Sequence, residues 1–417
     1  IFMSTKRNVA IIGGGAAGLL CAALSAKNGD CVTLFEKNRT LGKKLAITGK
    51  GRCNVTNHCS VSDVIANIPT NPKFLYASVS SFSPNDTMAL FESLGTPLKT
   101  ERGNRVFPVS DRARDIVDSL VRFAKDSGVR ILCNEKVEQL FFSDTPSAGK
   151  VVTGLRTQNT VYSFEKLVIA TGGVSYPLTG STGDGYRFAA AAGHNIVTPS
   201  PSLVPLETLD AWCRAAQGLS LKNCALHLVD RDSGKIIYED FGEMLFTHFG
   251  ISGPMVLSAS SHIRHMQSGR YQIVLDLKPA LDEKMLDARI CSDFSAEQNR
   301  DFQNSLGALL PGKLIAPIIS LSGIDPRKKV HSITKEERKR LDTLLKHLPI
   351  TVQGFRPISE AIVTSGGVNT REINPKTMQS KLVSGLYFAG EVIDVDAYTG
   401  GFNLQIAFST AHTAALN

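Results

Sequence analysis

Near the N-terminus, continuously apolar runs alternate with a helical pattern. The apolar run 8–12 (NVAII) is followed by the glycine-rich turn 13–18 (GGGAAG) and by the helical stretch 19–29 (LLCAALSAKNG). Gly29 is suited to end that helix, and the next run, 31–36 (CVTLFE), is continuously apolar like strands buried on both faces of a parallel sheet. The pattern predicts strand, tight turn, helix and strand, which is one βαβ unit.

Further along, residues 110–128 place apolar side chains at helical spacing, with Ser110 or Asp111 as the cap, and predict a helix. Several short β-type runs separated by turn residues follow it. The last of them, 166–173 (KLVIATGG), ends at a glycine pair. The chain is therefore expected to return to the sheet at this point.

The pattern changes between residues 196 and 356. Here proline-rich and β-like segments precede a charged helical region whose last helix carries a capping box, Thr334 with Glu337. Afterwards 385–391 (GLYFAGE) is typical of another buried strand, and the final helix opens at a double glycine. We expect an α/β protein whose first domain is discontinuous, residues 1–195 and 357–417, around an inserted domain that is β-rich in 196–280 and 349–356 and helical in 281–348.

The glycine-rich turn contains the pattern G-x-G-x-x-G at Gly13, Gly15 and Gly18, and Glu36 follows at the end of the second predicted strand. In a dinucleotide-binding βαβ unit the first glycine permits the tight turn, the second lets a pyrophosphate approach the backbone, and the third allows close packing of helix and strand. The helix N-terminus offers free N–H groups, and the acid accepts hydrogen bonds from ribose hydroxyls. The spacing in this context predicts a dinucleotide site rather than a merely structural turn.

Two distant segments favour FAD over a nicotinamide dinucleotide. The run 166–173 resembles the strand by which FAD-binding domains of the glutathione-reductase type return to the cofactor. The run 385–394 (GLYFAGEVID) resembles their C-terminal strand, which ends in an acid that contacts the ribityl chain. That acid is Asp394 or Glu391.

Six ordered motifs resemble a bacterial flavoprotein family over essentially the whole chain: the BaiN-type or "aminoacetone oxidase family" NAD(P)/FAD-dependent oxidoreductases. The motifs are AIIGGGAAGL, LGKKLAITGKGRCNVTN, VIATGGVSYPLTGSTGDGYRFA, LFTHFGISGP, AIVTSGGVNTREINPKTM and GLYFAGEVIDVDAYTGGFNLQ. The resemblance implies a Rossmann-like FAD-binding domain of the glutathione-reductase type, split by an inserted β-barrel-like and helical domain. It also implies non-covalent FAD, with NAD(P)H as a candidate transient reductant.

The glycine pattern and the resemblance together assign cofactor contacts to several separate segments. The first turn and the region after the second strand contribute Gly13, Gly15, Ala16, Ala17, Gly18, Glu36, Lys37 and Lys44. The loop 46–57 (AITGKGRCNVTN) contributes Thr48, Gly49, Gly51, Arg52, Cys53 and Asn54. Later segments contribute Val137, Thr171, Gly172, Gly173, Gly390, Glu391, Asp394, Gly400, Gly401, Phe402 and Asn403, the last three with backbone N–H groups aimed at the flavin pyrimidine ring.

Cys53 is also a candidate catalytic thiol. It lies where flavoprotein disulfide reductases place a redox cysteine pair, and Cys59 follows after five intervening residues. Arg52 beside it would lower the pKa of the thiol by charge proximity. The reductase pattern has four intervening residues on one helix, whereas the asparagines here indicate turns, so a role in the cofactor loop is the alternative. Lys50 stands where the family pattern often has a glycine, which reduces backbone freedom and adds a cation.

Three further side chains are candidates for substrate contacts. His248 could donate a proton or a hydrogen bond in a substrate pocket, and Tyr176 and Asn369 lie in loops expected near the flavin edge. The segment 180–185 (GSTGDG) is typical of a second glycine-rich approach to a cofactor. No carboxylate or cysteine is spaced to join His262 and His265, so no metal site is expected.

Composition narrows the functional classes. The chain has 417 residues, of which 42% are hydrophobic and 20% charged, and no apolar run reaches the ~18 residues of a membrane span. We therefore expect no membrane insertion, and the N-terminus shows no secretory signal pattern. Eight irregularly spaced cysteines favour a reducing, cytoplasmic setting. Nothing in the pattern indicates an oligomeric state.

We therefore expect an FAD-dependent oxidoreductase that transfers hydride between the flavin and a small organic substrate. The net charge of +8 keeps a flavin-dependent RNA-modifying enzyme as an alternative, with DPRKK (325–329) and KEERKR (335–340) as its basic footprint. Acids alternate with bases in the second segment, which is equally typical of a solvated helix face. A disulfide reductase that uses Cys53 and a non-catalytic flavin electron carrier or sensor are the remaining alternatives.

Overall fold

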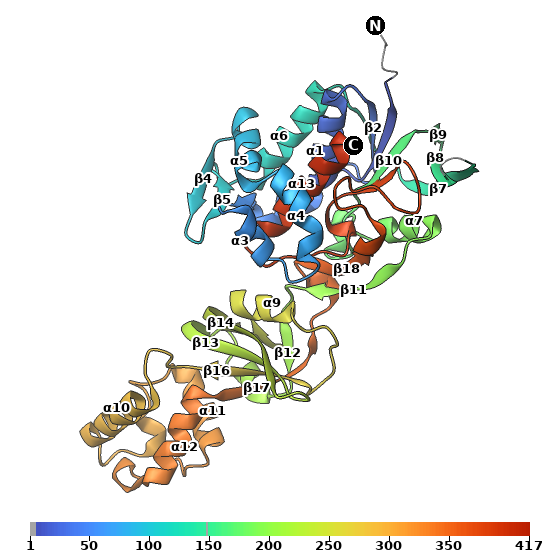
Figure 1. Cartoon of the computed structure of the whole chain (residues 1–417). Coiled ribbons are helices and arrows are strands. Elements are labelled where there is room, and N and C mark those ends of the chain that lie inside the picture. Colours follow the sequence, from blue (N-terminus) through green and yellow to red (C-terminus); the bar gives the residue numbers. More distant parts are fainter. Residues whose placement is uncertain (1–5, 147–148) are drawn as a thin grey trace. The chain divides into compact units, whose positions relative to one another are not determined.

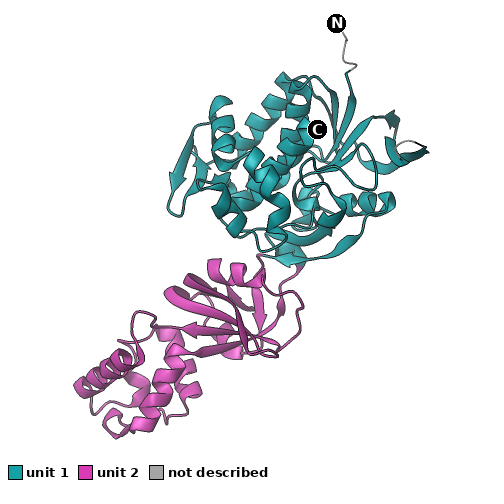
Figure 2. Cartoon of the chain, viewed as in Figure 1, with its two compact units in different colours: residues 1–202, 358–417 teal, residues 203–357 magenta. Residues whose placement is uncertain are grey.

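The computed structural model describes residues 6–146 and 149–417. They form two compact units, coloured separately in Figure 2: unit 1 comprises the described residues up to 202 together with 358–417, and unit 2 comprises residues 203–357. The first boundary lies at Leu203 rather than at residue 196, because β11 (Ile196–Ser202) pairs antiparallel with β18 (Val363–Val368) of unit 1. Both connections between the units therefore leave from one two-stranded ribbon.

Unit 1 is built on a parallel five-stranded sheet of order β19-β10-β1-β2-β6 (Figure 1). The strands are short, and all but the edge strand β6 are almost wholly buried, as expected for a sheet covered on both faces. They span Asn8–Ile12 (β1), Cys31–Glu36 (β2), Arg130–Cys133 (β6), Lys166–Ile169 (β10) and Leu386–Phe388 (β19). The predicted βαβ unit is confirmed, with α1 (Ala16–Lys27) as its helix.

Helices and smaller sheets surround this sheet. Helix α1 contacts both α6 (Ala113–Asp126) and the C-terminal helix α13 (Phe402–Leu416). Phe35 of β2 packs edge-on against Tyr162, at 5.1 Å between ring centroids, which attaches a second sheet. That sheet consists of β7 (Val137–Thr145), β8 (Gly149–Thr157) and β9 (Val161–Ser163).

A third sheet and four short helices complete the N-terminal half of unit 1. The sheet, of order β3-β5-β4, consists of β3 (Thr56–Asn57), β4 (Leu98–Glu101) and β5 (Arg105–Pro108). The helices are α2 (Lys43–Ile47), α3 (Val61–Ala66), α4 (Pro72–Ser81) and α5 (Pro84–Ser93), and α7 (Asp184–Ala192) follows β10 later in the chain.

Unit 2 is a closed barrel extended by helices, which confirms the predicted β-barrel-like and helical insertion. The barrel strands, in spatial order, are β12 (Leu206–Thr208), β15 (Gly250–Ser252), β14 (Lys235–Phe246), β13 (Ser220–Asp230), β16 (Tyr271–Asp276) and β17 (Leu348–Phe355). Two helices lie within the barrel segment, α8 (Ala211–Ala215) and α9 (Pro254–Ser260). Three more, α10 (Glu283–Ala296), α11 (Gly312–Ser322) and α12 (Lys335–Lys346), interrupt the last barrel connection.

The predicted capping box at the start of α12 is confirmed, with Thr334 accepting from the Glu337 backbone N–H and Glu337 accepting from that of Thr334. No helix among residues 6–146 and 149–417 has both the length and the apolarity that a membrane span needs.

Candidate functional site

The N-terminus of α1 is open and carries no side-chain cap. Gly15 is its capping residue, and a Cβ atom built there would meet no atom within 4 Å. Gly13, by contrast, has a φ of 108°, and a Cβ there would lie 2.5 Å from the carbonyl oxygen of Ala170. A Cβ on Gly18 would collide with the carbonyl oxygen of Gly13. Gly13 and Gly18 thus allow close packing, while Gly15 leaves the free N–H groups of α1 accessible to an anion.

Glu36 ends β2 and is almost fully buried behind this turn. Its carboxylate accepts hydrogen bonds from the Gly14 N–H at 2.8 Å, from the Asn38 N–H at 2.8 Å and from Asn38 Nδ2 at 2.7 Å. The acid therefore also braces the glycine turn, in addition to the ribose contact expected for it.

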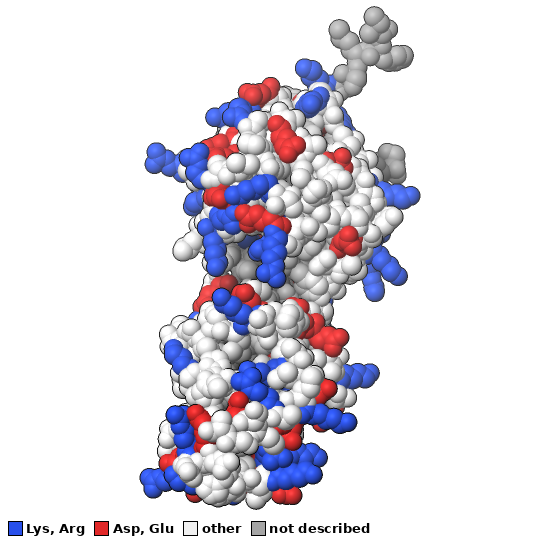
Figure 3. Space-filling view, turned by 90° about the vertical axis from the view of Figure 1, so that its left-hand side faces the viewer, with Lys and Arg blue, Asp and Glu red and all other residues white. Residues whose placement is uncertain are grey.

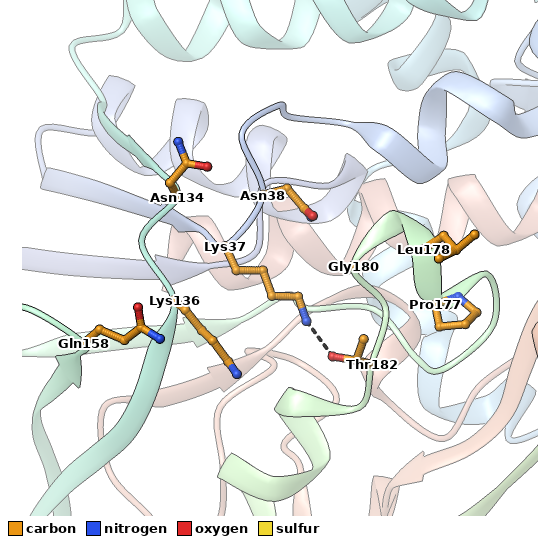
Figure 4. A pocket seen from close by; sticks show the side chains of 9 residues that line it. All are labelled: Lys37, Asn38, Asn134, Lys136, Gln158, Pro177, Leu178, Gly180 and Thr182. Atoms are coloured by element: carbon orange, nitrogen blue, oxygen red, sulfur yellow. Dashed lines mark hydrogen bonds between the residues drawn. The ribbon is translucent and has the colours of Figure 1, made fainter.

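A polar cavity of about 440 Å³ opens beside Glu36 (Figure 4). The Lys37 and Lys136 side chains point into the same space, and Lys37 Nζ donates to Thr182 Oγ1 at 2.5 Å and to Asp184 Oδ2 at 2.6 Å. Val137, expected to contact the cofactor, begins β7 directly after Lys136. The cavity is lined by Lys37, Asn38, Asn134, Lys136, Gln158, Pro177, Leu178, Gly180 and Thr182.

The strand β19 delivers Glu391 to the first turn of α1. Gly390 has a φ of 76°, and a Cβ there would lie 3.0 Å from the Cβ of Ala17. The Glu391 carboxylate accepts from Lys44 Nζ at 2.7 and 2.9 Å, from Ser175 Oγ at 3.0 Å and from the Thr364 N–H at 2.9 Å. Two of the residues expected at the cofactor, Lys44 and Glu391, are thus brought into direct contact.

Asp394, the other candidate acid, lies further along the same segment. Its side chain and its carbonyl oxygen accept from Asn71 Nδ2 at 3.0 and 2.7 Å, and its backbone N–H donates to Val368. Of the two acids, Glu391 is the one adjacent to α1 and within 4 Å of a Cβ built on Gly172.

Tyr186 is a candidate that the sequence interpretation missed. It is 8% exposed, and its hydroxyl has no hydrogen-bond partner among the described residues. The hydroxyl lies behind the Gly172–Gly173 turn, 3.0 Å from a Cβ built on Gly173. Burial, and then the negative charges of Glu391 and Asp394, raise the pKa of Tyr186, so the phenol stays protonated. In the sequence, Tyr186 directly follows the glycine-rich segment GSTGDG (180–185), and this position was the signal that could have identified it.

A second orphaned polar atom lies in the loop 46–57. Asn54 Oδ1 is buried without a hydrogen-bond partner in the described part of the chain. Buried polar atoms are rarely left unpaired, because the lost hydration costs roughly 1–3 kcal/mol. Together with the open N-terminus of α1, Asn54 and Tyr186 fit a unit that completes its hydrogen bonds with a bound polar cofactor.

The structure favours the cofactor-loop role of Cys53 over the catalytic one. The side chain is fully buried, and burial raises the pKa of the thiol to about 12, while a hydrogen bond with Thr48 lowers it only in part. Burial likewise raises the pKa of Cys59 to about 11. All eight cysteines lie in the described ranges and are free thiols. This environment disfavours the thiolate that disulfide exchange requires.

Arg52 does not activate Cys53 either. Its guanidinium forms ion pairs with Glu101 and Asp111 and lies 4.2 Å above the Phe107 ring. These contacts lower the pKa of Glu101 through the Arg52 hydrogen bond, and the pKa of Asp111 through hydrogen bonds from Lys99 and Arg52. Arg52 thus joins the loop 46–57 to the β4–β5 hairpin, and its charge is neutralised there.

The backbone of the same loop adopts left-handed conformations. Gly49, Lys50, Gly51 and Cys53 have φ values of 57°, 57°, 85° and 61°. Glycine accepts this conformation without strain, whereas a side chain with a Cβ does so at a cost. Lys50, which stands where the family pattern has glycine, is therefore strained.

Helix α13 also begins without a side-chain cap, at Gly401 with a φ of 100°. A Cβ on Gly401 would collide with the Thr56 carbonyl, so this glycine allows β3 to pack against the helix start. The Asn403 amide is used locally, because it accepts from the Ala397 N–H at 2.9 Å and donates to the Ala397 carbonyl at 2.7 Å. The backbone N–H groups at this end of α13, which no side chain caps, are the groups that we expect to meet a cofactor.

Other predicted residues have local roles. The Tyr176 carbonyl accepts from the Thr179 N–H and hydroxyl, and the Asn369 side chain accepts from the Arg371 N–H. His248 is exposed on unit 2, with its ring edge-on to Phe249, and its substrate role stays a prediction.

Three of the seven basic residues in the segments 325–329 and 335–340 of unit 2 form ion pairs within the unit. Lys328 pairs with Glu337, Lys329 with Asp301 and Arg338 with Asp287. These pairs are typical of a solvated helical surface, and the alternative of an RNA footprint at residues 325–340 stays a prediction.

Residues 7–417 match the family described as HI0933-like protein Rossmann domain. This chain belongs to the HI0933-like family. The resemblance expected from the six motifs is thereby confirmed, and so is FAD as the cofactor of an oxidoreductase. The reading as a non-catalytic carrier or sensor is set aside accordingly.

Two relatives of this HI0933-like protein are similar along the whole chain. It is 34% identical over 419 residues to the ribosomal RNA dihydrouridine synthase of Haemophilus influenzae, covering 100% of this chain and 99% of that one. It is 30% identical over 413 residues to the 3-dehydro-bile acid delta(4,6)-reductase of Clostridium scindens, covering 97% of each.

Solved structures share the fold of this HI0933-like protein. The 3-ketosteroid delta1-dehydrogenase of Sterolibacterium denitrificans has a TM-score of 0.52 at 14% identity, with 99% of each chain covered. A flavocytochrome c3 fumarate reductase has a TM-score of 0.50 at 18% identity, covering 99% of this chain and 78% of that one. At these identities the likeness concerns the fold alone.

Proposed function

We propose that FAD is held along the carboxyl edge of the parallel sheet in unit 1. The uncapped N-terminus of α1 would bind the pyrophosphate, and Glu36 the ribose hydroxyls. The polar cavity beside Glu36 would take the adenosine end, Glu391 and Lys44 the ribityl chain, and the start of α13 the pyrimidine ring. Asn54 and Tyr186 would each gain the partner they lack.

We further propose that the reaction is the reduction of uridine to dihydrouridine in ribosomal RNA. The observation that carries this proposal is the 34% identity to a ribosomal RNA dihydrouridine synthase over all of this chain, including the barrel unit. A second synthase of that name, from Escherichia coli, is 31% identical over 410 residues. The net charge of +8 suits a polyanionic substrate.

The chemistry is a reduction of a carbon–carbon double bond conjugated to a carbonyl. In uracil, a hydride added to C6 and a proton added to C5 convert the C5=C6 double bond to a single bond, and NAD(P)H is the proposed source of the two electrons. Bound FAD supplies the hydride when reduced. The chain itself must position the base, exclude water and keep polar groups such as the Tyr186 hydroxyl protonated.

The test compares two substrates under one reductant. Purified protein with FAD is mixed anaerobically with NADPH or NADH and with in vitro transcribed, unmodified rRNA, and nucleosides are analysed by mass spectrometry. We expect dihydrouridine in the rRNA. A parallel reaction contains a steroid 3-ketone with conjugated 4,6 double bonds. Reduction of the steroid with no dihydrouridine in rRNA would refute the RNA substrate while retaining the flavin reductase.

A further inference from the structure

The β4–β5 hairpin presents two arginines at its tip. Gly103 and Asn104 have φ values of 75° and 58°, so the turn is tight. Arg102 and Arg105 flank it, and both are exposed. No acidic side chain of the described residues lies within ion-pair distance of either guanidinium, and Arg105 Nε donates to the Arg102 carbonyl at 3.1 Å. Two positive charges therefore face solvent without a counter-charge from the protein.

The base of the same hairpin is different. Lys99 pairs with Asp111 at 2.7 Å, and Arg52 pairs with Glu101 and Asp111. These cations brace the hairpin and are neutralised by Glu101 of β4 and by Asp111, which follows β5. The contrast shows that the uncompensated charge is confined to the tip rather than spread over the hairpin.

Contacts through β3 fix the tip beside the start of α13. Asn57 Nδ2 donates to the carbonyl oxygens of Gly103 at 3.0 Å and of Gly400 at 3.1 Å. The His58 N–H donates to the Asn104 carbonyl at 2.7 Å. One amide thus joins the hairpin turn to the glycine pair that opens α13, so the two arginines occupy a defined place next to this helix end.

This face of unit 1 is accessible. β4 and β5 lie at the left of Figure 1, and Figure 3 looks onto that side, where Lys and Arg side chains project among fewer acidic ones. Lys50 is exposed on the adjacent loop, where a Cβ built on Gly49 would lie 3.5 Å from the Phe107 ring of β5. It adds a third cation without an acidic partner in the described ranges.

The geometry points to the tip of the β4–β5 hairpin as the site that binds the RNA backbone next to the target uridine. This inference rests on the proposed function, because the base must reach the cofactor end at α13 while its neighbouring phosphates stay at the rim. Guanidinium groups bind phosphate with two parallel hydrogen bonds, so Arg102 and Arg105 suit two phosphates of one strand. Contacts of this kind position RNA without reading its sequence.

The experiment compares two double variants that each remove two exposed cations. Arg102→Ala/Arg105→Ala removes the hairpin tip charges, and Arg327→Ala/Lys335→Ala removes two from the unit 2 segments first considered as an RNA footprint. Binding of an rRNA transcript is measured as a function of salt, together with FAD content and the rate of flavin reduction by NADPH. We expect the hairpin variant to bind on the order of tenfold more weakly, with a salt slope smaller by about 2, and the control variant to match wild type.

The experiment distinguishes a failure of the hairpin inference from a failure of the proposed function. If the wild-type protein makes dihydrouridine in rRNA but the hairpin variant keeps its affinity and salt slope, the hairpin inference is refuted and the proposed function stands. If the wild-type protein neither modifies nor retains rRNA, the proposed function fails first. Unchanged FAD content and thermal midpoint in the hairpin variant show that lost RNA binding is not lost folding, as expected for exposed side chains.

Discussion

Tyr186→Phe should stabilise the FAD-free protein and weaken its binding of FAD. In the structure the Tyr186 hydroxyl is buried and without a partner. A buried polar group in that state costs roughly 1–3 kcal/mol, and phenylalanine fills nearly the same volume. The FAD-free variant should therefore be more stable than FAD-free wild type, and its thermal midpoint should rise by about 2–4 °C for each kcal/mol.

The same substitution should weaken FAD binding. If the hydroxyl donates to the bound cofactor, its removal deletes one hydrogen bond whose net value is about 0.5–1.5 kcal/mol. The FAD dissociation constant should then rise about 2- to 12-fold. A purely structural role of the phenol predicts no such change, so the combination of a more stable apoprotein and weaker binding identifies a group reserved for the ligand.

The assay uses apoprotein prepared by removing flavin, thermal melts with and without FAD, and titration of FAD by flavin fluorescence. Tyr387→Phe is the matched control, because this buried tyrosine has a hydroxyl that donates to the Asn417 carbonyl at 3.4 Å. The control should gain no stability and bind FAD as wild type does. If Tyr186→Phe leaves the FAD dissociation constant unchanged, the proposed contact is refuted.

Three further predictions concern Cys53, Lys50 and His194. Cys53→Ser should keep FAD and keep turnover within about twofold, since the thiol is buried with a raised pKa; retained flavin with abolished turnover would restore thiol chemistry. Lys50→Gly should raise the free energy of unfolding, measured in urea titrations, by about 1 kcal/mol, because glycine adopts the left-handed backbone conformation at this position without strain. A lower free energy of unfolding in the variant would show that Lys50 is not strained. Burial lowers the pKa of His194, although Glu372 opposes the shift. Below pH ~6.5 the unfolded histidine therefore takes up a proton before the folded one does, so stability should fall as pH decreases, and this fall should be smaller in His194→Gln; equal pH slopes would exclude His194 as the cause.

The sequence by itself determined the elements whose signals are local. The apolar runs 8–12 and 31–36 form strands because a continuously apolar segment is stable where both faces of a parallel sheet are buried. Gly13 and Gly18 are required because a side chain at either position would collide with nearby backbone atoms. The capping box of Thr334 and Glu337 involves residues three positions apart. The order of six motifs was enough to recognise the family, its cofactor and its inserted barrel.

Only the tertiary structure decided what individual side chains contact. The sequence places Arg52 next to Cys53, but in the folded chain the Arg52 guanidinium forms ion pairs with Glu101 and Asp111 instead. The pKa of the Cys53 thiol is raised because the folded chain buries the side chain. The Asn57 amide joins Gly103 to Gly400, residues nearly three hundred positions apart, and this contact helps to place the hairpin arginines beside α13. Burial, charge pairing and unpaired hydroxyls arise from long-range packing, which periodicity and spacing along the chain do not encode.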